Sequence, residues 1–181
     1  STIQVTEHFS SSTVYHREGV GPYVIPNTTV WPNALLAPSS SGSPMLILGG
    51  TPTIECDNSD WIIVQCSFTF SMTASPQVAS ANKGSPQANF RLCYEETQSV
   101  TSGGILGSIR RFNSYLVVGS TLVPPRSSCT IVAAVQAPTT SGGTNNYAFW
   151  LDAKCYHSKD TTVTTAGEVS QVQLFARVIK K

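Results

Sequence analysis

The stretch Trp61–Met72 alternates apolar and polar residues almost without interruption. Successive side chains of a β-strand point to opposite faces of its sheet, so this period of two predicts a strand with one buried face. The stretch is longer than an average strand, which predicts a central position in its sheet. Its apolar positions, separated by single residues, are Ile62, Val64, Cys66, Phe68, Phe70 and Met72.

The same alternation recurs along the chain and predicts further strands joined by turns. Turn-forming residues fill the segments between the strands, and we expect long loops at Thr73–Asn89 and Pro138–Asn146. Gly103, Gly104 and Gly107 are expected to interrupt the chain between two strands. The longer predicted strands are Phe90–Glu95, Ile109–Val118, Cys129–Ala137, Tyr147–Tyr156 and Val169–Ile179, and the shorter ones are Val5–Phe9, Tyr23–Ile25, Leu35–Leu36, Met45–Leu48, Thr51–Cys56 and Thr161–Thr165.

This pattern predicts an all-β fold of about eight to ten strands and no helix. No window carries apolar residues at helical spacing behind a capping residue. Many strands at short spacing are typical of a sandwich or barrel, which also protects the strand edges. We therefore predict a single antiparallel jelly-roll or β-sandwich domain over residues 1–181.

Three apolar side chains break the alternation of their strands. Trp61 and Ile63 lie on the polar side of the long strand, and Trp150 lies opposite the main apolar set of Tyr147–Tyr156. Each therefore places apolar surface where solvent is expected. Three explanations could account for this apolar surface. A second layer of the chain could cover it, a neighbouring subunit could pack on it, or a sugar or receptor could bind to it.

Composition excludes several classes of function. Charged residues make up only 12% of the chain, about half the usual share, and the net charge is +1. Near-neutrality argues against nucleic acid as the main partner. No apolar run is long enough to cross a bilayer, and no signal peptide is visible. Ser1 is consistent with a complete chain made in the cytoplasm, or equally with a cleaved precursor.

The five cysteines are widely and unevenly spaced. They are Cys56, Cys66, Cys93, Cys129 and Cys155. Several fall in register with the apolar residues of a strand, where cysteine acts as a small apolar side chain. Free buried thiols, one or two disulfides, and a metal site are the three alternatives.

The sequence offers little reactive chemistry. His8, His16 and His157 are not spaced as metal ligands, and no serine-nucleophile or phosphate-binding motif occurs. We therefore expect no enzyme activity and no cofactor or metal. A carboxylate site assembled from several strands is the alternative, with Glu95, Glu96, Asp152 and Asp160 as its candidates.

Polar groups on the two longest loops are the other candidates for contact with a partner. Loops at the ends of a sandwich commonly carry binding residues. We predict that Asn82 and Lys83, in Thr73–Asn89, and Asn145 and Asn146, after Ser141, contact a receptor or a neighbouring subunit.

The last part of the chain resembles the closing hairpin of TNF/C1q-like jelly rolls and of jelly-roll domains in virus and phage structural proteins. The residues that carry the resemblance are NNYAFWLDAKCYH, the turn KDTTVTTAGEV and the final strand SQVQLFARVIKK. The resemblance implies a central last strand and a trimer around an aromatic-rich axis. The chain lacks the basic arm of many virus shell proteins.

These features predict a viral structural protein: a capsid, capsid-decoration or spike and fibre-head protein. It would self-assemble, as a trimer by the resemblance, and would contact other virion proteins and a host receptor or glycan. It would be made in the host cytoplasm and reside in the virion. The alternatives are an extracellular TNF/C1q-like or lectin-like binding module, for which Asn27-Thr28-Thr29 would be a glycosylation site, and a β-sandwich hydrolase.

Overall fold

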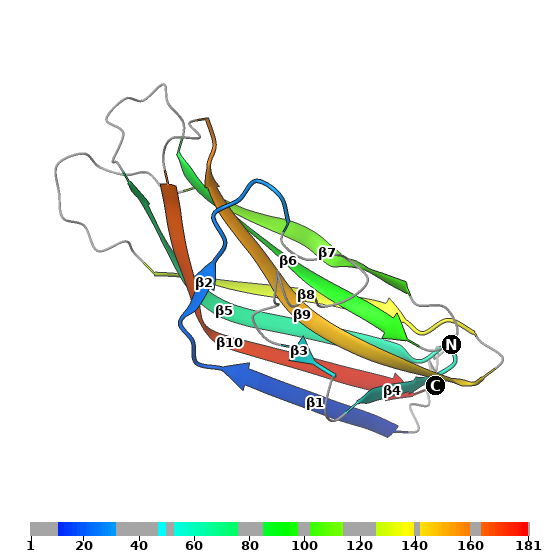
Figure 1. Ribbon diagram of the computed structural model, residues 1–181. Helices are drawn as coiled ribbons and strands as arrows, with labels where there is room; N and C mark the ends of the chain where they lie inside the picture. Colours follow the sequence, from blue (N-terminus) through cyan, green and yellow to red (C-terminus); the bar gives the residue numbers. More distant parts are fainter. Residues whose placement is uncertain are drawn as a thin grey trace, which may run out of the picture.

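The computed structural model describes residues 11–31, 47–49, 53–75, 85–97, 102–113, 126–139, 142–159 and 164–180. Within these residues the chain forms ten β-strands and no helix (Figure 1). The strands predicted at Val5–Phe9 and Leu35–Leu36 lie outside the described residues, as do Asn82, Lys83 and Asp160.

The strands form two five-stranded antiparallel sheets. Sheet A follows the order β1-β10-β5-β8, and β2 pairs with the same edge of β10 as β1. Its strands are β1 (Ser11–Gly19), β2 (Tyr23–Ile25), β5 (Trp61–Ser75), β8 (Ser127–Gln136) and β10 (Thr164–Lys180). Sheet B follows the order β3-β9-β6-β7, and β4 also pairs with β9. Its strands are β3 (Ile47–Leu48), β4 (Ile54–Asp57), β6 (Pro86–Thr97), β7 (Ser102–Asn113) and β9 (Thr144–His157).

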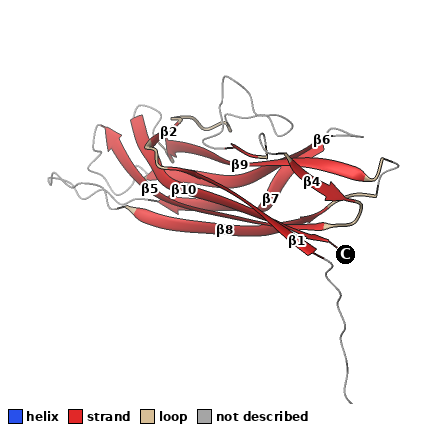
Figure 2. Ribbon diagram, turned by 90° about the horizontal axis from the view of Figure 1, so that it is seen from below, coloured by secondary structure: helices blue, strands red, loops and turns tan. Residues whose placement is uncertain are grey.

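The two sheets pack face to face, with β6 and β9 in one layer and β5, β8 and β10 in the other (Figure 2). From β1 onward the chain passes repeatedly between the sheets, and only β6 and β7 form a hairpin of long, directly consecutive strands. This order is that of a jelly roll, in which two Greek keys enclose one core. The predicted all-β fold class is therefore confirmed.

The relation between the last two strands differs from the expected closing hairpin. β9 and β10 lie in different sheets and do not pair with one another. β10 is central in sheet A, because β5 pairs with one of its edges and β1 and β2 with the other. The central last strand is thus present, but the hairpin prediction is wrong because β9 and β10 belong to different sheets.

The core lies between the sheets and follows the alternation of the sequence. All six apolar positions from Ile62 to Met72 on β5 are buried. Phe90 of β6 lies at the centre, with its ring centroid 4.7 Å from that of Phe68 and 4.9 Å from that of Phe70. Tilted aromatic rings at these separations attract one another in addition to burying apolar area.

Three predicted boundaries are wrong. The three glycines expected to interrupt the chain all lie within β7. The pairing of β7 with β6 shifts at Gly107, which has a φ of 71°, so glycine permits a bulge there rather than a break. Part of the expected loop Thr73–Asn89 is strand, because β5 runs to Ser75 and β6 begins at Pro86. Thr164 and Thr165 likewise belong to β10 and not to a separate edge strand.

All five cysteines are buried and free. The disulfide alternative is therefore wrong. Burial raises the pKa of the Cys66 thiol to about 12, which keeps it protonated and unreactive at neutral pH. No group of three or more His, Cys, Asp or Glu side chains within the described residues is arranged to hold a metal ion.

Replacing Phe90 by alanine tests the centre of this core. We expect the free energy of unfolding to fall by about 3–5 kcal/mol, because a large cavity would open between the sheets. Urea unfolding followed by circular dichroism measures the change. Val24→Ala is the control, since Val24 is 78% exposed. A loss for Phe90→Ala no larger than that of the control would contradict this description of the core.

Candidate functional site

The outer face of sheet A carries an exposed apolar surface. Trp61 and Ile63 of β5 are 41% and 40% exposed. Val14 of β1 and Val132 of β8 are exposed to an even greater extent. The four side chains share the outer face, because Ile63 pairs with Arg177, which pairs with Val14, and Val132 pairs with Gln65. We call these four residues the sheet A patch.

A shallow hollow with few charges lies beside the sheet A patch. It is lined by Val14, Ile63, Gln65, Phe175 and Arg177. The His16 ring stacks on Phe175 at a centroid distance of 4.3 Å. Arg177 is opposite both Ile63 and Val14, whereas Glu18 and Glu168 lie four and nine residues farther along β10, and Arg17 is opposite the core residue Leu174. Apolar contact is therefore the main interaction that this face offers.

The three off-pattern side chains have different environments. Trp61 and Ile63 are open to solvent in the single chain. Trp150 also lies on an outer face, because its neighbours Phe149 and Leu151 point into the core, yet it is 0% exposed. Trp150 is thus covered within the single chain, and the predicted role of all three side chains in binding or assembly stays a prediction.

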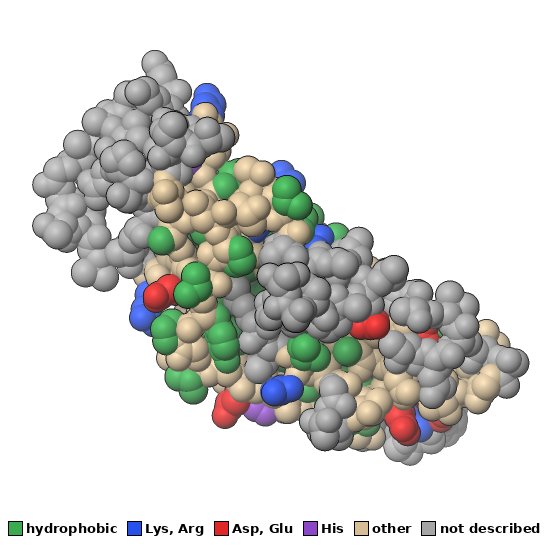
Figure 3. All heavy atoms as spheres, viewed as in Figure 1, with side chains coloured by type: hydrophobic (Ala, Val, Ile, Leu, Met, Phe, Trp, Pro, Cys, Tyr) green, Lys and Arg blue, Asp and Glu red, His purple; other side chains and the backbone are tan. Residues whose placement is uncertain are grey.

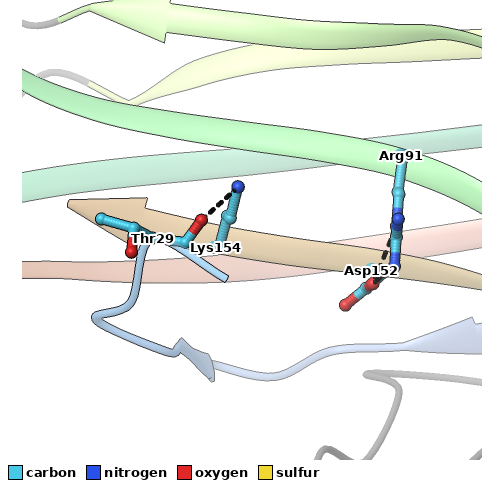
Figure 4. A network of polar contacts seen from close by, with 4 residues as sticks. All are labelled: Thr29, Arg91, Asp152 and Lys154. Carbon is cyan, nitrogen blue, oxygen red and sulfur yellow. Dashed lines mark hydrogen bonds and ion pairs between the residues drawn. The ribbon is translucent and has the colours of Figure 1, made fainter. Parts of the chain in front are cut away.

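The segment after β2 passes from sheet A to the outer side of sheet B. Cys155 N of β9 donates to Pro26 O, and Thr28 N donates to Cys155 O, both at 2.9 Å. Lys154 Nζ donates to Thr29 O at 2.6 Å (Figure 4). These bonds bring Trp31 over the sheet, with the Arg91 guanidinium carbon 4.2 Å and Lys154 Nζ 4.7 Å from its ring centroid.

A buried ion pair lies beside Trp31. Arg91 of β6 and Asp152 of β9 are directly opposite in the register, and Arg91 Nε and Nη2 lie 2.9 Å and 2.8 Å from Asp152 Oδ2 (Figure 4). Burial raises the pKa of the Asp152 carboxyl, and Arg91 opposes that shift. The carboxylate is therefore neutralised by Arg91 and Trp31 stacks against the guanidinium, an arrangement that stabilises the cover over sheet B.

A chain of neutral polar groups continues from this pair toward the β7 edge. Asn89 Nδ2 donates to the Tyr156 hydroxyl at 3.2 Å, and that hydroxyl donates to Gln87 Oε1. Gln87 Nε2 in turn donates to Asn113 Oδ1 at 2.9 Å.

Burial lowers the pKa of Lys154, and the positive charges of Arg91 and Arg111 lower it further. This part of sheet B thus concentrates positive charge.

The carboxylates do not converge as a hydrolase would require. Asp152 is opposite Arg91 whereas Glu95 is opposite Ala148, which places the two roughly 13 Å apart along the strands. Glu96 follows Glu95 on the strand and points to the other face of the sheet. A glycosidase pair needs a separation of roughly 5–10 Å. The predicted carboxylate alternative is therefore wrong for Glu95, Glu96 and Asp152.

The loop placement predicted for Asn145 and Asn146 is wrong. Both lie in β9, opposite Cys56 and Glu55 of β4. Asn145 is buried, and its Nδ2 donates to Pro138 O at 3.3 Å. The sequence PTTSGGTNN is polar throughout, as is typical of a loop, but its last residues pair with β4 and therefore belong to β9. The predicted contacts of Asn82 and Lys83 lie outside the described residues.

Sequence reasoning missed the Arg91–Asp152 pair and the basic surface around it. The outward polar positions of β6 and β9 were visible in the sequence as two separate alternations. Their interaction depends on the register between two strands that are about sixty residues apart in the chain, Arg91 and Asp152 being separated by 61 positions. No local pattern encodes such a register.

The described part of the chain contains no helix that is long and apolar enough to span a membrane.

Comparisons with known proteins give structural matches only. No protein-family model and no curated protein matches the chain. Among solved structures, T=1 particles derived from infectious bursal virus match with a TM-score of 0.44 and 8% identity, over 99% of this chain and 38% of that one. Infectious bursal disease virus of the Gx strain matches with a TM-score of 0.41 and 9% identity, over 96% and 40%. The crystal structure of the T13 particle of the same virus matches with a TM-score of 0.41 and 10% identity, over 99% and 41%.

The chain thus spans about two fifths of the length of these structures. At such TM-scores and identities the matches do not assign the chain to a family.

Replacing Arg91 by methionine tests the buried pair. The change leaves Asp152 buried without a counter-charge, so we expect a loss of about 3–5 kcal/mol in the free energy of unfolding near pH 7. Without Arg91 the folded-state pKa of Asp152 rises further, and stability is lost as pH rises through it. The loss should therefore shrink near pH 3, below the ordinary Asp pKa of about 3.9, where the carboxyl is largely protonated in both states.

The double variant Arg91→Met with Asp152→Leu is the control. It removes both charges, so we expect it to be more stable than the single variant at about pH 7. Urea unfolding of the three proteins at both pH values measures these differences. A single-variant loss that is the same at both pH values would contradict the proposed role of the carboxyl charge.

Proposed function

We propose that this chain is a structural protein of a virus particle, and that it works by associating with copies of itself through the sheet A patch. The observation that carries the proposal is the exposure of Trp61 and Ile63 on the regular part of a long central strand. A large aromatic side chain beside a branched aliphatic one forms the kind of desolvated centre that protein interfaces use.

The position of the patch supports association as its purpose. Strand β5 pairs on both edges, with β10 and β8, so the patch lies on a rigid sheet and not on a loop. A face held by two neighbouring strands changes little on binding, which lowers the entropy cost of association. Arg177 is the one charged side chain of β1 and β10 directly opposite a patch residue, so two copies can approach without strong repulsion.

The viral part of the proposal follows from the resemblance of the closing strands together with the jelly-roll strand order. The order supports it because the last strand is central in its sheet, as the resemblance implies. A capsid, capsid-decoration or spike role in the virion is proposed on this basis. The same proposal includes a trimeric state and contacts with other virion proteins. It also includes attachment to a host receptor or glycan. No catalytic step is required of any residue.

Replacing Ile63 by lysine tests the role of the patch. We expect the wild-type chain to form oligomers at micromolar concentration and Ile63→Lys to form smaller assemblies of lower molar mass, because a buried unpaired charge at an interface costs several kcal/mol. Size-exclusion chromatography with light scattering measures the molar mass. Ile63 is exposed, so the thermal stability of the folded chain should change little.

The matched control is Ile105→Lys. Ile105 is 37% exposed but lies on β7 of sheet B. The Ile105→Lys variant should form oligomers as the wild type does. A monomeric wild type, or equal effects of the two substitutions, would contradict the assignment of the interface to sheet A.

A further inference from the structure

The charges of sheet B are segregated along its strands. At the level where β9 begins, the outer side of the sheet carries Glu55 and Asp57 on β4 together with Glu95 on β6, while Glu96 is buried on the inner face. The described strands of sheet B place no basic side chain at that level. Lys180 of sheet A reaches Asp57 at 2.9 Å and neutralises one of these charges. We call this the acidic end.

The opposite end of the same sheet is basic. Arg110 and Arg111 of β7 pair with Phe90 and Asn89, and Asn89 pairs with Lys154 of β9. Lys159 lies two residues beyond the end of β9. The carboxylate among the charged groups that act on Lys154 is Asp152, which is already bound by Arg91. We call the group of Arg110, Arg111, Lys154 and Lys159 the basic end.

The two ends are too far apart to compensate one another. Glu55 and Lys154 lie at β9 levels eight residues apart, which corresponds to roughly 27 Å at the rise of a β-strand. The Debye length at physiological ionic strength is about 8 Å. Figure 3 shows acidic side chains at the right-hand end of the molecule and basic ones along its upper edge. Each end therefore presents its own charge to an approaching molecule.

We propose that the basic end of one copy binds the acidic end of the next copy, so that chains associate head to tail along sheet B. The occupant is a second copy because this chain carries both complementary surfaces, while its overall net charge is only +1. Such a contact joins two different surfaces, and it either closes into a ring or continues. It rests on the proposed self-association and adds a second interface to the one on sheet A.

The accessible members of each end identify the residues to change. Arg110 and Arg111 are exposed, as is Glu55, and Glu95 is half-buried. Arg91 and Asp57 are left intact, because each forms an ion pair within the chain. The basic-end variant is Arg110→Glu with Arg111→Glu, and the acidic-end variant is Glu55→Lys with Glu95→Lys. Circular dichroism and thermal melting establish that each variant is folded.

The matched control changes net charge by the same amount elsewhere. Glu168→Lys alters an exposed carboxylate of β10 that lies nine residues from Arg177, the partner of Ile63, and it is compared with Glu55→Lys alone, which has the same net charge. Sedimentation velocity of each protein at about 50 mM and about 500 mM salt measures self-association with and without screening. We expect either end variant alone to weaken association by roughly tenfold or more at low salt, and the control to match the wild type.

Mixing the two end variants gives the sharpest test. The basic-end variant keeps its acidic end and the acidic-end variant keeps its basic end, so an equimolar mixture should form pairs that contain one copy of each. Complexes that contain both variants support the proposal, and so does their dissociation at high salt. A mixture that stays monomeric, or single variants that associate like the wild type, would overturn it. If a reversed variant does not fold, glutamine at the same positions should give an intermediate loss of association.

The same measurements separate this proposal from the role of the sheet A patch. If Ile63→Lys abolishes association while both charge reversals leave it intact, the head-to-tail contact is wrong and the sheet A interface stands. If the charge reversals abolish association and Ile63→Lys does not, the sheet A interface is wrong and the head-to-tail contact stands. A wild type that is monomeric at both salt concentrations overturns both proposals.

Discussion

The fold depends on the burial of one face of each sheet against the other. On β5 this requirement is met by an uninterrupted alternation from Ile62 to Met72, and on β6 by Phe90 at the centre of the core. Because side chains on a strand alternate, a sheet with one buried face necessarily has an outer face as well. A two-layer sandwich therefore has two outer faces, and the character of each decides what the molecule can contact.

In this chain the two outer faces differ. On sheet B, residues 26–31 run beside β9, Trp31 stacks on the buried Arg91–Asp152 pair, and Trp150 is also removed from solvent. The charges that stay exposed there are separated by sign along the strands. On sheet A, Trp61 and Ile63 stay open to solvent. A charged, partly covered face and an open apolar face give one molecule two distinct ways to contact its copies.

The sequence predicts most of the strands because period two is a local signal, and the alternation of β5 and β9 agrees with the observed burial. It also identifies Trp61, Ile63 and Trp150 as exceptions to that alternation. It does not distinguish the exposed Trp61 from the buried Trp150, because the difference comes from what crosses each sheet. The bulge at Gly107 and the Arg91–Asp152 pair are likewise set by register between strands, which no local pattern specifies.

The central claim is that the outer face of sheet A is completed by another copy of the chain, and the tryptophans report on it directly. Hydroxyl-radical footprinting with mass spectrometry measures the oxidation of each one in dilute and in concentrated solution. Trp61 should be oxidised in dilute solution and protected on concentration, while Trp150 should be protected in both. Trp61 that is equally reactive at both concentrations, or Trp150 that is oxidised in the folded dilute chain, would contradict the account.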